Sequence, residues 1–440
     1  MLRLLINSYT CCPNMGSEPG MGWNWIISLS KYCDVYVITE SEYRCQIEEW
    51  CRANPELSAN LHFFWNTIGG DDNALCDKIR KMCWNQGDWR FYRYYKKWQK
   101  DTAAIARDII RGVYPDDSYN KPSSHVKIDI LHQLNMIGFR EPGYLWEVSK
   151  ETGVPFVWGP VDAKEGFPMS YVEGAPVKNI LFLHVKNIIT KIQLLFDKRV
   201  RCAANQASII FSATSNSALS FRKYLNKTSI MMNETGCSFD HNNIDTFEPN
   251  HSSPKDGNSC DTFRLLWVGK FDFRKQLQLA IRCMSSLSDK QIELHIVGSG
   301  DAEKYKEVVR ELNISERIIW RGQLSHEEVQ RAMCESDLLF FTSVAEGTPH
   351  VVLEALSNGL PVLCFDTCGQ GDSVDSSVGI KIPLTNPSQS VCDFAEKISY
   401  LYTHPEELKR MSLNCRKRAE ELSWDNKARQ VIEAYQRILR

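Results

Sequence analysis

Two blocks of short apolar strands that alternate with helical segments constrain this chain more than any other feature. The first block has predicted strands at 2–7, 34–39, 61–65, 129–133, 156–159, 208–212 and 229–233, with helical spacing at 23–31 and 42–52. The second block has predicted strands at 264–268, 293–297, 318–320, 338–341 and 361–364. Such alternation favours parallel sheets that are covered by helices on both faces. The sequence therefore predicts an α/β protein with two Rossmann-like domains.

A change of composition separates the two blocks. His241–Asp261 is rich in Asn, Ser, Asp and Pro and has few apolar residues, which is typical of a linker or an exposed loop. We assign residues 1–245 to an N-terminal domain, 246–262 to the linker and 263–422 to a C-terminal domain. Residues 423–440 have the apolar spacing of an amphipathic helix, which we expect to pack back on the N-terminal domain.

The overall composition excludes several classes of protein. The formal net charge of the 440 residues is -2, which argues against a nucleic-acid partner. No run of 18 apolar residues is present, and the N-terminus has the pattern of a first strand, not that of a signal peptide. The 16 cysteines include no Cys-x-x-Cys pair, so we expect neither a zinc site nor another metal or cofactor. Scattered thiols fit a cytoplasmic location.

The residues that carry chemistry concentrate in 343–361, SVAEGTPHVVLEALSNGLP. A buried strand precedes a tight loop of Glu346, Gly347, Thr348 and Pro349, and Pro349 suits the first position of the following helix. Free N–H groups and the dipole at this helix start favour a diphosphate. Glu354, on the helix, can accept hydrogen bonds from ribose hydroxyls, and Glu346 can do so for a hexose. Each glutamate alone is also what a solvent-exposed charge looks like.

Two further strand ends in the second block carry glycines and cations. In LLWVGKFDFRK, the strand ends at Val268, Gly269 permits a close turn, and Lys270 and Lys275 follow. Two cations at a strand end can neutralise a diphosphate, although they can also be ordinary surface lysines. In HIVGSG, Gly298 follows the next strand, but no third glycine completes a dinucleotide fingerprint, so NAD binding is not expected.

These segments resemble retaining glycosyltransferase family 4, which has the GT-B fold of two Rossmann-like domains facing a cleft. The resemblance rests on VGKFDFRK, HIVGSGDAEKY, IIWRGQLSHEEV, SDLLFFTSVAEGTPHVVLEALSNGLPVLCFD and CGQGDSV. It implies that Lys270 and Lys275 bind the donor phosphates, that Glu346 contacts the transferred sugar, and that Glu354 holds the ribose. Gly269, Gly298, Gly347, Thr348 and Pro349 complete the expected donor site.

The first block resembles a bacterial subgroup of the same family. The matching segments are GSEPGMGWNW, ILHQLNMIGFREPGYLW, PFVWGPVDAKEGFP and NETG. The resemblance places Gly20 and Gly22 in the first strand-to-helix loop, on the acceptor side of the cleft. His132, at a strand end, is a candidate active-site histidine; the alternative is a buried structural histidine. We assign Glu346, His132 and Lys275 as the candidate catalytic residues.

Four positions depart from the family pattern. Lys270 replaces the usual arginine, which keeps the charge but loses the bidentate fork. Gln276 replaces a glycine, Asp162-Ala163-Lys164 replaces a glycine-rich run, and CGQGD replaces the usual GGxxE loop. The last two departures leave the sugar and the acceptor open.

Together these features predict transfer of a sugar from a nucleoside-diphosphate sugar to an acceptor hydroxyl, with retention, in bacterial surface-polysaccharide synthesis. The acceptor would be a glycan or a lipid-linked glycan. The alternatives are a sugar-nucleotide epimerase on the same fold and a non-catalytic sugar-nucleotide-binding protein.

Two basic amphipathic stretches raise the hypothesis of peripheral contact with an anionic membrane at its cytoplasmic face. Trp84–Lys100 interleaves aromatic with basic residues, and Lys186–Arg201 combines basic residues with Ile, Leu and Phe. Such side chains suit the headgroup region of a bilayer. The alternative is that the apolar residues face the core and the basic residues face solvent.

Overall fold

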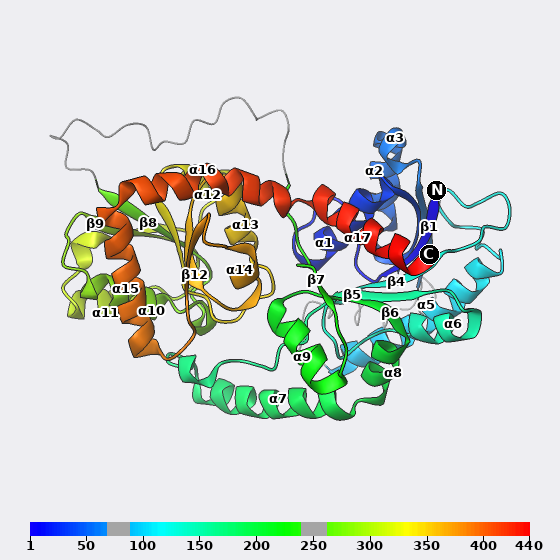
Figure 1. Ribbon diagram of the computed structural model, residues 1–440, viewed down its shortest axis with the longest axis horizontal. Coiled ribbons are helices and arrows are strands. Elements are labelled where there is room, and N and C mark those ends of the chain that lie inside the picture. Colours follow the sequence, from blue (N-terminus) through cyan, green and yellow to red (C-terminus); the bar gives the residue numbers. More distant parts are fainter. Residues whose placement is uncertain (68–88, 239–261) are drawn as a thin grey trace.

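The computed structural model describes residues 1–67, 89–238 and 262–440, which form two α/β domains side by side (Figure 1). The N-terminal domain has a parallel seven-stranded sheet in the order β3-β2-β1-β4-β5-β6-β7. Its strands are β1 (Leu2–Ser8), β2 (Cys33–Glu40), β3 (Leu61–Asn66), β4 (Ile130–Asn135), β5 (Phe156–Val161), β6 (Ala207–Ser212) and β7 (Ile230–Met231). The last strand is shorter than the predicted 229–233.

Helices cover both faces of this sheet because its strands alternate between two apolar faces. Leu4 and Ile6 of β1 belong to one core, whereas Leu5 belongs to the other. The helices of the domain are α1 (Ser17–Ser30), α2 (Arg44–Ala53), α3 (Pro55–Ser58), α5 (Trp89–Ile110), α6 (Leu145–Thr152), α7 (Val177–Phe196), α8 (Lys198–Gln206) and α9 (Ser215–Leu225).

The C-terminal domain has a parallel six-stranded sheet in the order β10-β9-β8-β11-β12-β13. Its strands are β8 (Phe263–Val268), β9 (Ile292–Val297), β10 (Ile318–Gly322), β11 (Leu338–Phe341), β12 (Val362–Phe365) and β13 (Gly379–Ile382). Its helices are α10 (Leu277–Ser286), α11 (Glu303–Glu311), α12 (His326–Cys334), α13 (His350–Ser357), α14 (Cys368–Ser373), α15 (Pro387–Thr403) and α16 (Pro405–Glu421). The two sheets confirm the predicted pair of Rossmann-like domains.

The last helix returns to the first domain. α16 runs along one edge of the molecule, and α17 (Trp424–Leu439) continues from it onto the N-terminal domain (Figure 1). Trp424, Val431 and Tyr435 join the same core as Leu4 and Ile6. The end of the chain is therefore part of the core of the domain in which the chain begins.

The aromatic and basic residues of α5 lie on different sides of the helix. Phe91, Tyr95 and Trp98 are fully buried and pack around Tyr9, whereas the lysines of the same turns are exposed. For this part of Trp84–Lys100 the structure favours the alternative, because Phe91, Tyr94, Tyr95 and Trp98 are core residues. Trp84 and the side chain of Trp89 lie outside the described residues. Within the described part of the chain, no helix is long and apolar enough to cross a membrane, and every cysteine is a free thiol.

Candidate active site

An ion pair between Lys275 and Glu346 lies at the carboxyl edge of the C-terminal sheet. The two side chains follow the neighbouring strands β8 and β11. Lys275 Nζ lies 2.6 Å from Glu346 Oε1, and the Ser343 hydroxyl donates to the same oxygen at 2.5 Å. The side chains are 23% and 18% exposed, so both remain within reach of a ligand. The structure thus brings together two of the three candidate catalytic residues.

Backbone contacts fix the two loops that carry this pair. The Thr342 hydroxyl donates to the carbonyl of Lys275 at 2.8 Å, and the Val344 N–H donates to the carbonyl of Arg274 at 3.0 Å. These bonds join the end of β11 to the turn before α10. The relative position of the lysine and the carboxylate is therefore set by the backbone.

Gly269 and Gly298 occupy the close approach between the loops that follow β8 and β9. Gly298 has a φ of +154°, and a Cβ at this position would lie 1.8 Å from the Gly269 carbonyl oxygen. A Cβ on Gly269 would lie 3.5 Å from the Lys275 side chain. Only glycine therefore fits at 298. Of the two predicted glycines, Gly269 is the one that contacts the Lys275 side chain.

Two hydrogen bonds from α14 hold the loop before α13 in place. Gly347 accepts a hydrogen bond from Gly369 N–H at 2.9 Å, and the Gln370 side chain donates to the Ser343 carbonyl at 3.0 Å. Gly369 and Gln370 belong to the CGQGD segment, so this departure from the family pattern supports the loop. Pro349 is the N-cap residue of α13, so the helix begins at His350, one residue later than predicted.

Glu354 and Lys270 lie at the edges of the site. The Glu354 side chain is 32% exposed and lies 4.0 Å from the Nδ1 atom of His326, the first residue of α12. Lys270 is exposed in the loop that also contains Gly269. Among the described residues, neither side chain has a hydrogen bond or an ion pair with Lys275 or Glu346.

Sequence reasoning missed Glu234, which bridges the two domains. This residue of NETG is buried, and its two carboxylate oxygens accept hydrogen bonds from Thr348, from the N–H at 2.5 Å and from the hydroxyl at 2.7 Å. A Cβ on Gly347 would lie 2.2 Å from Glu234 Oε1. The carboxylate thus sits against the start of α13, where negative charge is favourable.

Two side chains hold the Glu234 segment in place. The Trp25 indole N–H donates to the Glu234 carbonyl at 2.9 Å. Lys427 of α17 donates to the carbonyls of Asn233 and Thr235, at 3.2 Å for the first. Burial lowers the pKa of Lys427 to about 8, so the ammonium remains mostly charged at neutral pH. The last helix therefore positions an element of the site.

Lys164 is a second missed residue, and it also crosses between the domains. Its ammonium donates to the Glu346 carbonyl at 2.7 Å and lies 3.7 Å from the Asp162 carboxylate. Burial lowers the pKa of Lys164, but Asp162, Cys368 and Glu346 outweigh burial and raise it overall. The Asp162-Ala163-Lys164 departure thus replaces a glycine-rich run with a cation beside the candidate sugar-binding loop.

Gly20 and Gly22 lie inside α1, which corrects the prediction of a loop. The helix starts at Ser17, earlier than the predicted residue 23. A Cβ on Gly20 would lie 1.8 Å from the Met15 carbonyl oxygen, and one on Gly22 would lie 2.3 Å from that of Thr10. The two glycines let the chain after β1 pack directly on the first turns of the helix.

His132 is a core residue, which corrects its assignment as a catalytic candidate. Its side chain is 1% exposed. Nε2 donates to the Gly159 carbonyl at 2.6 Å, and Nδ1 accepts from the Tyr435 hydroxyl at 2.6 Å. Both ring nitrogens are therefore used within the N-terminal domain, and burial lowers the pKa of the imidazole to about 4. The histidine links β4, β5 and α17 and is no longer part of the catalytic set.

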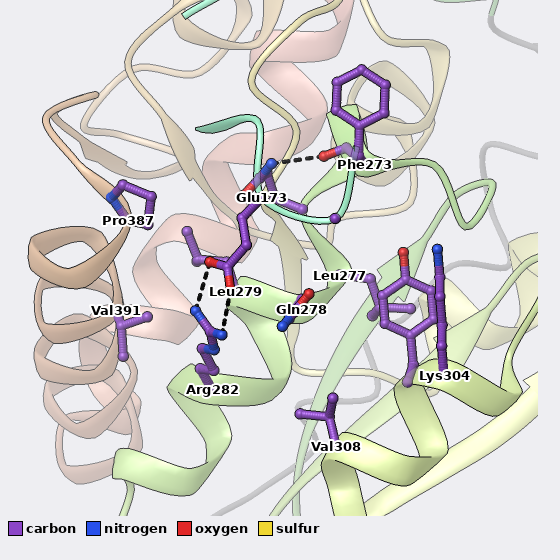
Figure 2. A pocket seen from close by; sticks show the side chains of 13 residues that line it. Glu173, Phe273, Leu277, Gln278, Leu279, Arg282, Lys304, Val308, Pro387 and Val391 are labelled. Carbon is purple, nitrogen blue, oxygen red and sulfur yellow. Dashed lines mark hydrogen bonds and ion pairs between the residues drawn. The ribbon is translucent and has the colours of Figure 1, made fainter. Parts of the chain in front are cut away.

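Two pockets lie near these loops. One of about 400 Å³ lies between the domains and is lined by Lys164, Lys191, Asn187, Ala345 and Cys368 among others. The other, of about 260 Å³, is shown in Figure 2 and lies among α10, α11 and α15, beside the Glu173–Arg282 ion pair. None of the predicted site residues lines either pocket, but Val344 and Ala345, which precede Glu346 in the chain, line the first one.

The C-terminal part of the chain matches the model of a known family. Residues 251–418 match the model of the family described as Glycosyl transferases group 1. The lipopolysaccharide 1,6-galactosyltransferase of Escherichia coli K12 is 34% identical over 143 residues, which are 31% of this chain and 39% of the relative. The enzyme of the same name from Salmonella typhimurium is 37% identical over 29% of this chain and 36% of its own length. The chain thus spans about two fifths of the curated relatives that it matches.

Solved structures match over both domains. The lipopolysaccharide outer core galactosyltransferase WaaB superposes with a TM-score of 0.58 at 15% identity, covering 98% of this chain and 99% of the other. Anabaena Alr3699/HepE in complex with UDP superposes with a TM-score of 0.56 at 14% identity, covering 99% and 100%. These likenesses, together with the two facing Rossmann-like domains, confirm the predicted GT-B fold.

The burial of His132 predicts a loss of stability in acid. The pKa is about 4 in the folded protein and about 6.5 in the unfolded chain, so the unfolded chain takes up the proton first. The contribution to stability is complete above pH 6.5 and is lost as the pH falls toward 4. Between pH 7 and 5 the loss is about 2 kcal/mol, measured by denaturant unfolding. His132→Gln should remove this part of the pH dependence and exposed His184→Gln should not; equal slopes in all three proteins would contradict the account.

The Glu234–Thr348 contact predicts a large effect from a small change. Glu234→Ala leaves the buried Thr348 N–H and hydroxyl without their acceptor, so the free energy of unfolding should fall by about 2 to 3 kcal/mol. The matched control is Glu173→Ala, which removes an exposed carboxylate that pairs with Arg282 across the same two domains, and should cost under about 1 kcal/mol. The free energy of unfolding is measured with guanidinium. An equal decrease in both variants would contradict a bridging role for Glu234.

Proposed function

We propose that this chain is a glycosyltransferase that moves a sugar from a nucleoside-diphosphate sugar to an acceptor hydroxyl, with retention of the anomeric configuration. The observation that carries the proposal is the Lys275–Glu346 pair, at 2.6 Å, in a loop that also contacts Lys164 and Glu234 of the opposite domain. A cation for a departing diphosphate and a carboxylate for sugar hydroxyls thus stand side by side between two Rossmann-like domains.

The donor side follows from the charges at the sheet edge. Lys275 and Lys270 follow β8, and the N-terminus of α13 lies on the neighbouring β11 unit. When the diphosphate binds, Lys275 can exchange its contact with Glu346 for a phosphate oxygen, which frees the carboxylate for the sugar. Glu354, on α13, would hold the ribose. Cations already in place where charge develops in the transition state are the main source of rate in such a reaction.

We place the acceptor in the pocket of about 400 Å³ that lies between the domains. Lys164 and Lys191 provide cations from the N-terminal domain, Val344 and Ala345 line the pocket from the other domain, and Lys164 donates to the Glu346 carbonyl. We propose a glycan or lipid-linked glycan of a bacterial surface polysaccharide as the acceptor, since two relatives carry the name lipopolysaccharide 1,6-galactosyltransferase. Anabaena Alr3699/HepE has crystal structures in complex with UDP and with UDP-glucose, which makes a UDP-sugar the first donor to test.

The charges that this mechanism uses belong to side chains of the chain, so we propose that no resident cofactor or metal is needed. Lys275 and Lys270 neutralise the diphosphate, and Lys164 faces the acceptor side. Turnover is therefore expected to persist in EDTA.

The test is release of nucleoside diphosphate from a panel of UDP-, GDP- and ADP-sugars, with product analysis and with binding followed by thermal shift. One donor should be turned over slowly without acceptor, and both Lys275→Ala and Glu346→Ala should lower the rate at least about 100-fold. Glu354→Ala should weaken donor binding. Lys417→Ala, an exposed lysine on α16, is the control and should leave the rate unchanged.

The other outcomes distinguish the alternatives. Conversion of one sugar nucleotide into its epimer, without release of diphosphate, would identify an epimerase. Donor binding without turnover, even when lipid-linked acceptors are supplied, would identify a binding protein. Neither binding nor turnover with any donor would overturn the site itself.

A further inference from the structure

The helix α7 exposes an apolar surface that the proposed chemistry does not use. Of the large apolar side chains that are exposed in the described part of the chain, many belong to this one helix. They are Val177, Leu181, Phe182, Val185, Ile188, Ile189, Ile192, Leu195 and Phe196, each between 40% and 81% exposed. Contiguous apolar surface of this kind is uncommon on soluble domains and marks a contact with another apolar phase.

The polar side chains that α7 turns toward the protein are Asn187, Thr190 and Gln193. Thr190 and Leu194 are its only buried residues. The Thr190 hydroxyl and the Gln193 side chain accept hydrogen bonds from Arg140, at 2.5 and 2.7 Å. The Asn187 amide exchanges two hydrogen bonds of 2.9 Å with the backbone of Phe167. Leu194 and Leu183 also pack against the protein, but most of the large apolar side chains of α7 face away from it, whereas the usual surface helix turns its apolar stripe to the core.

The exposed apolar residues share one side of the helix. Leu181, Val185, Ile188, Ile192 and Leu195 follow one another at intervals of three or four residues, which places them on one face. Figure 1 shows α7 along one edge of the molecule, below both domains and opposite α16. At this edge α7 is the outermost element, and its apolar face is about 30 Å long.

The charges of α7 favour an anionic partner. The helix contains no Asp or Glu, whereas Lys178, Lys186 and Lys191 lie on it. Lys198 and Arg201 follow directly on α8. Basic residues that flank an apolar face attract the negatively charged headgroups of a bilayer. A second copy of the chain would instead bring these cations toward one another.

We infer that α7 is a docking helix that lies in the interface of an anionic lipid bilayer, with its apolar face inserted at the level of the headgroups. The helix is not apolar enough to span the bilayer, so it would lie parallel to the membrane surface. The segment predicted as Lys186–Arg201 is thus only part of the docking surface, which begins at Val177.

Docking by α7 would bring the interdomain pocket to the membrane surface. Asn187 and Lys191 of α7 line the pocket that borders the Glu346 loop. A lipid-linked acceptor could then remain in the bilayer while its polar part enters between the domains. This consequence rests on the proposed function, whereas docking itself does not.

The test is flotation of the full chain with vesicles of phosphatidylcholine alone and of phosphatidylcholine with phosphatidylglycerol, at low and high salt. The protein should float with the anionic vesicles at low salt and be released by high salt. The triple variant Leu181→Gln, Ile188→Gln, Ile192→Gln should partition at least about tenfold less. The matched control is Leu57→Gln, Val113→Gln, Leu413→Gln, which removes three equally exposed apolar side chains elsewhere and should bind like the wild type.

Three outcomes would overturn the inference. The wild type could fail to bind anionic vesicles, or the two triple variants could lose binding equally. Alternatively, α7 could be a dimer contact: the wild type would then be dimeric, the α7 variant would be monomeric, and neither would bind vesicles. Donor binding in vesicle-free solution is measured in parallel on the same variants. It should be unchanged in the α7 variant, so a failure of docking is distinguishable from a failure of the donor site.

Discussion

The two hydrogen bonds from Thr348 to the Glu234 carboxylate are the contact on which the arrangement of the site depends. They join the loop before α13 to the N-terminal domain and bring a buried negative charge to the start of that helix. A Cβ on Gly347 would lie 2.2 Å from Glu234 Oε1, so any other residue at this position would displace the carboxylate from Thr348. Trp25 holds the Glu234 backbone from α1, and Lys427 holds the flanking carbonyls from α17. The chain thus uses its first and last helices to position one interdomain contact.

Two lysines, one from each domain, surround Glu346 next to that contact. Lys275 pairs with the Glu346 carboxylate, and Lys164 reaches the carbonyl of the same residue from the opposite domain. In the proposed function these cations are already in place before the donor binds, so little conformational entropy is lost when a phosphate or a sugar contacts them. Away from the site, the pocket shown in Figure 2 contains none of these charges and has no part in the proposed chemistry.

The fold and the strand–loop–helix units after β8 and β11 could be predicted because they depend on local patterns. Strand periodicity located both sheets, and the strand–loop–helix unit at 343–361 placed Glu346 beside a helix start. Contacts between distant residues left no local signal: Glu234 and Lys164 meet the donor loop only because the domains face one another. His132 shows the converse, since a strand-end histidine looks the same in sequence whether it lines a cleft or, as here, bonds Gly159 and Tyr435 in a core. On α5 and α7 the amphipathic patterns were alike, and only the packing shows that one buries its apolar residues and the other exposes them.

The central claim is that a nucleoside diphosphate binds between the two domains, at the Lys275–Glu346 pair. Hydrogen–deuterium exchange of the full chain with and without UDP, GDP and ADP tests it most directly. One nucleotide should slow exchange in 268–276 and 343–354 and, across the interface, in 162–165 and 233–236. Unchanged exchange with all three nucleotides, or protection confined to α10 and α11 around the pocket of Figure 2, would contradict the account.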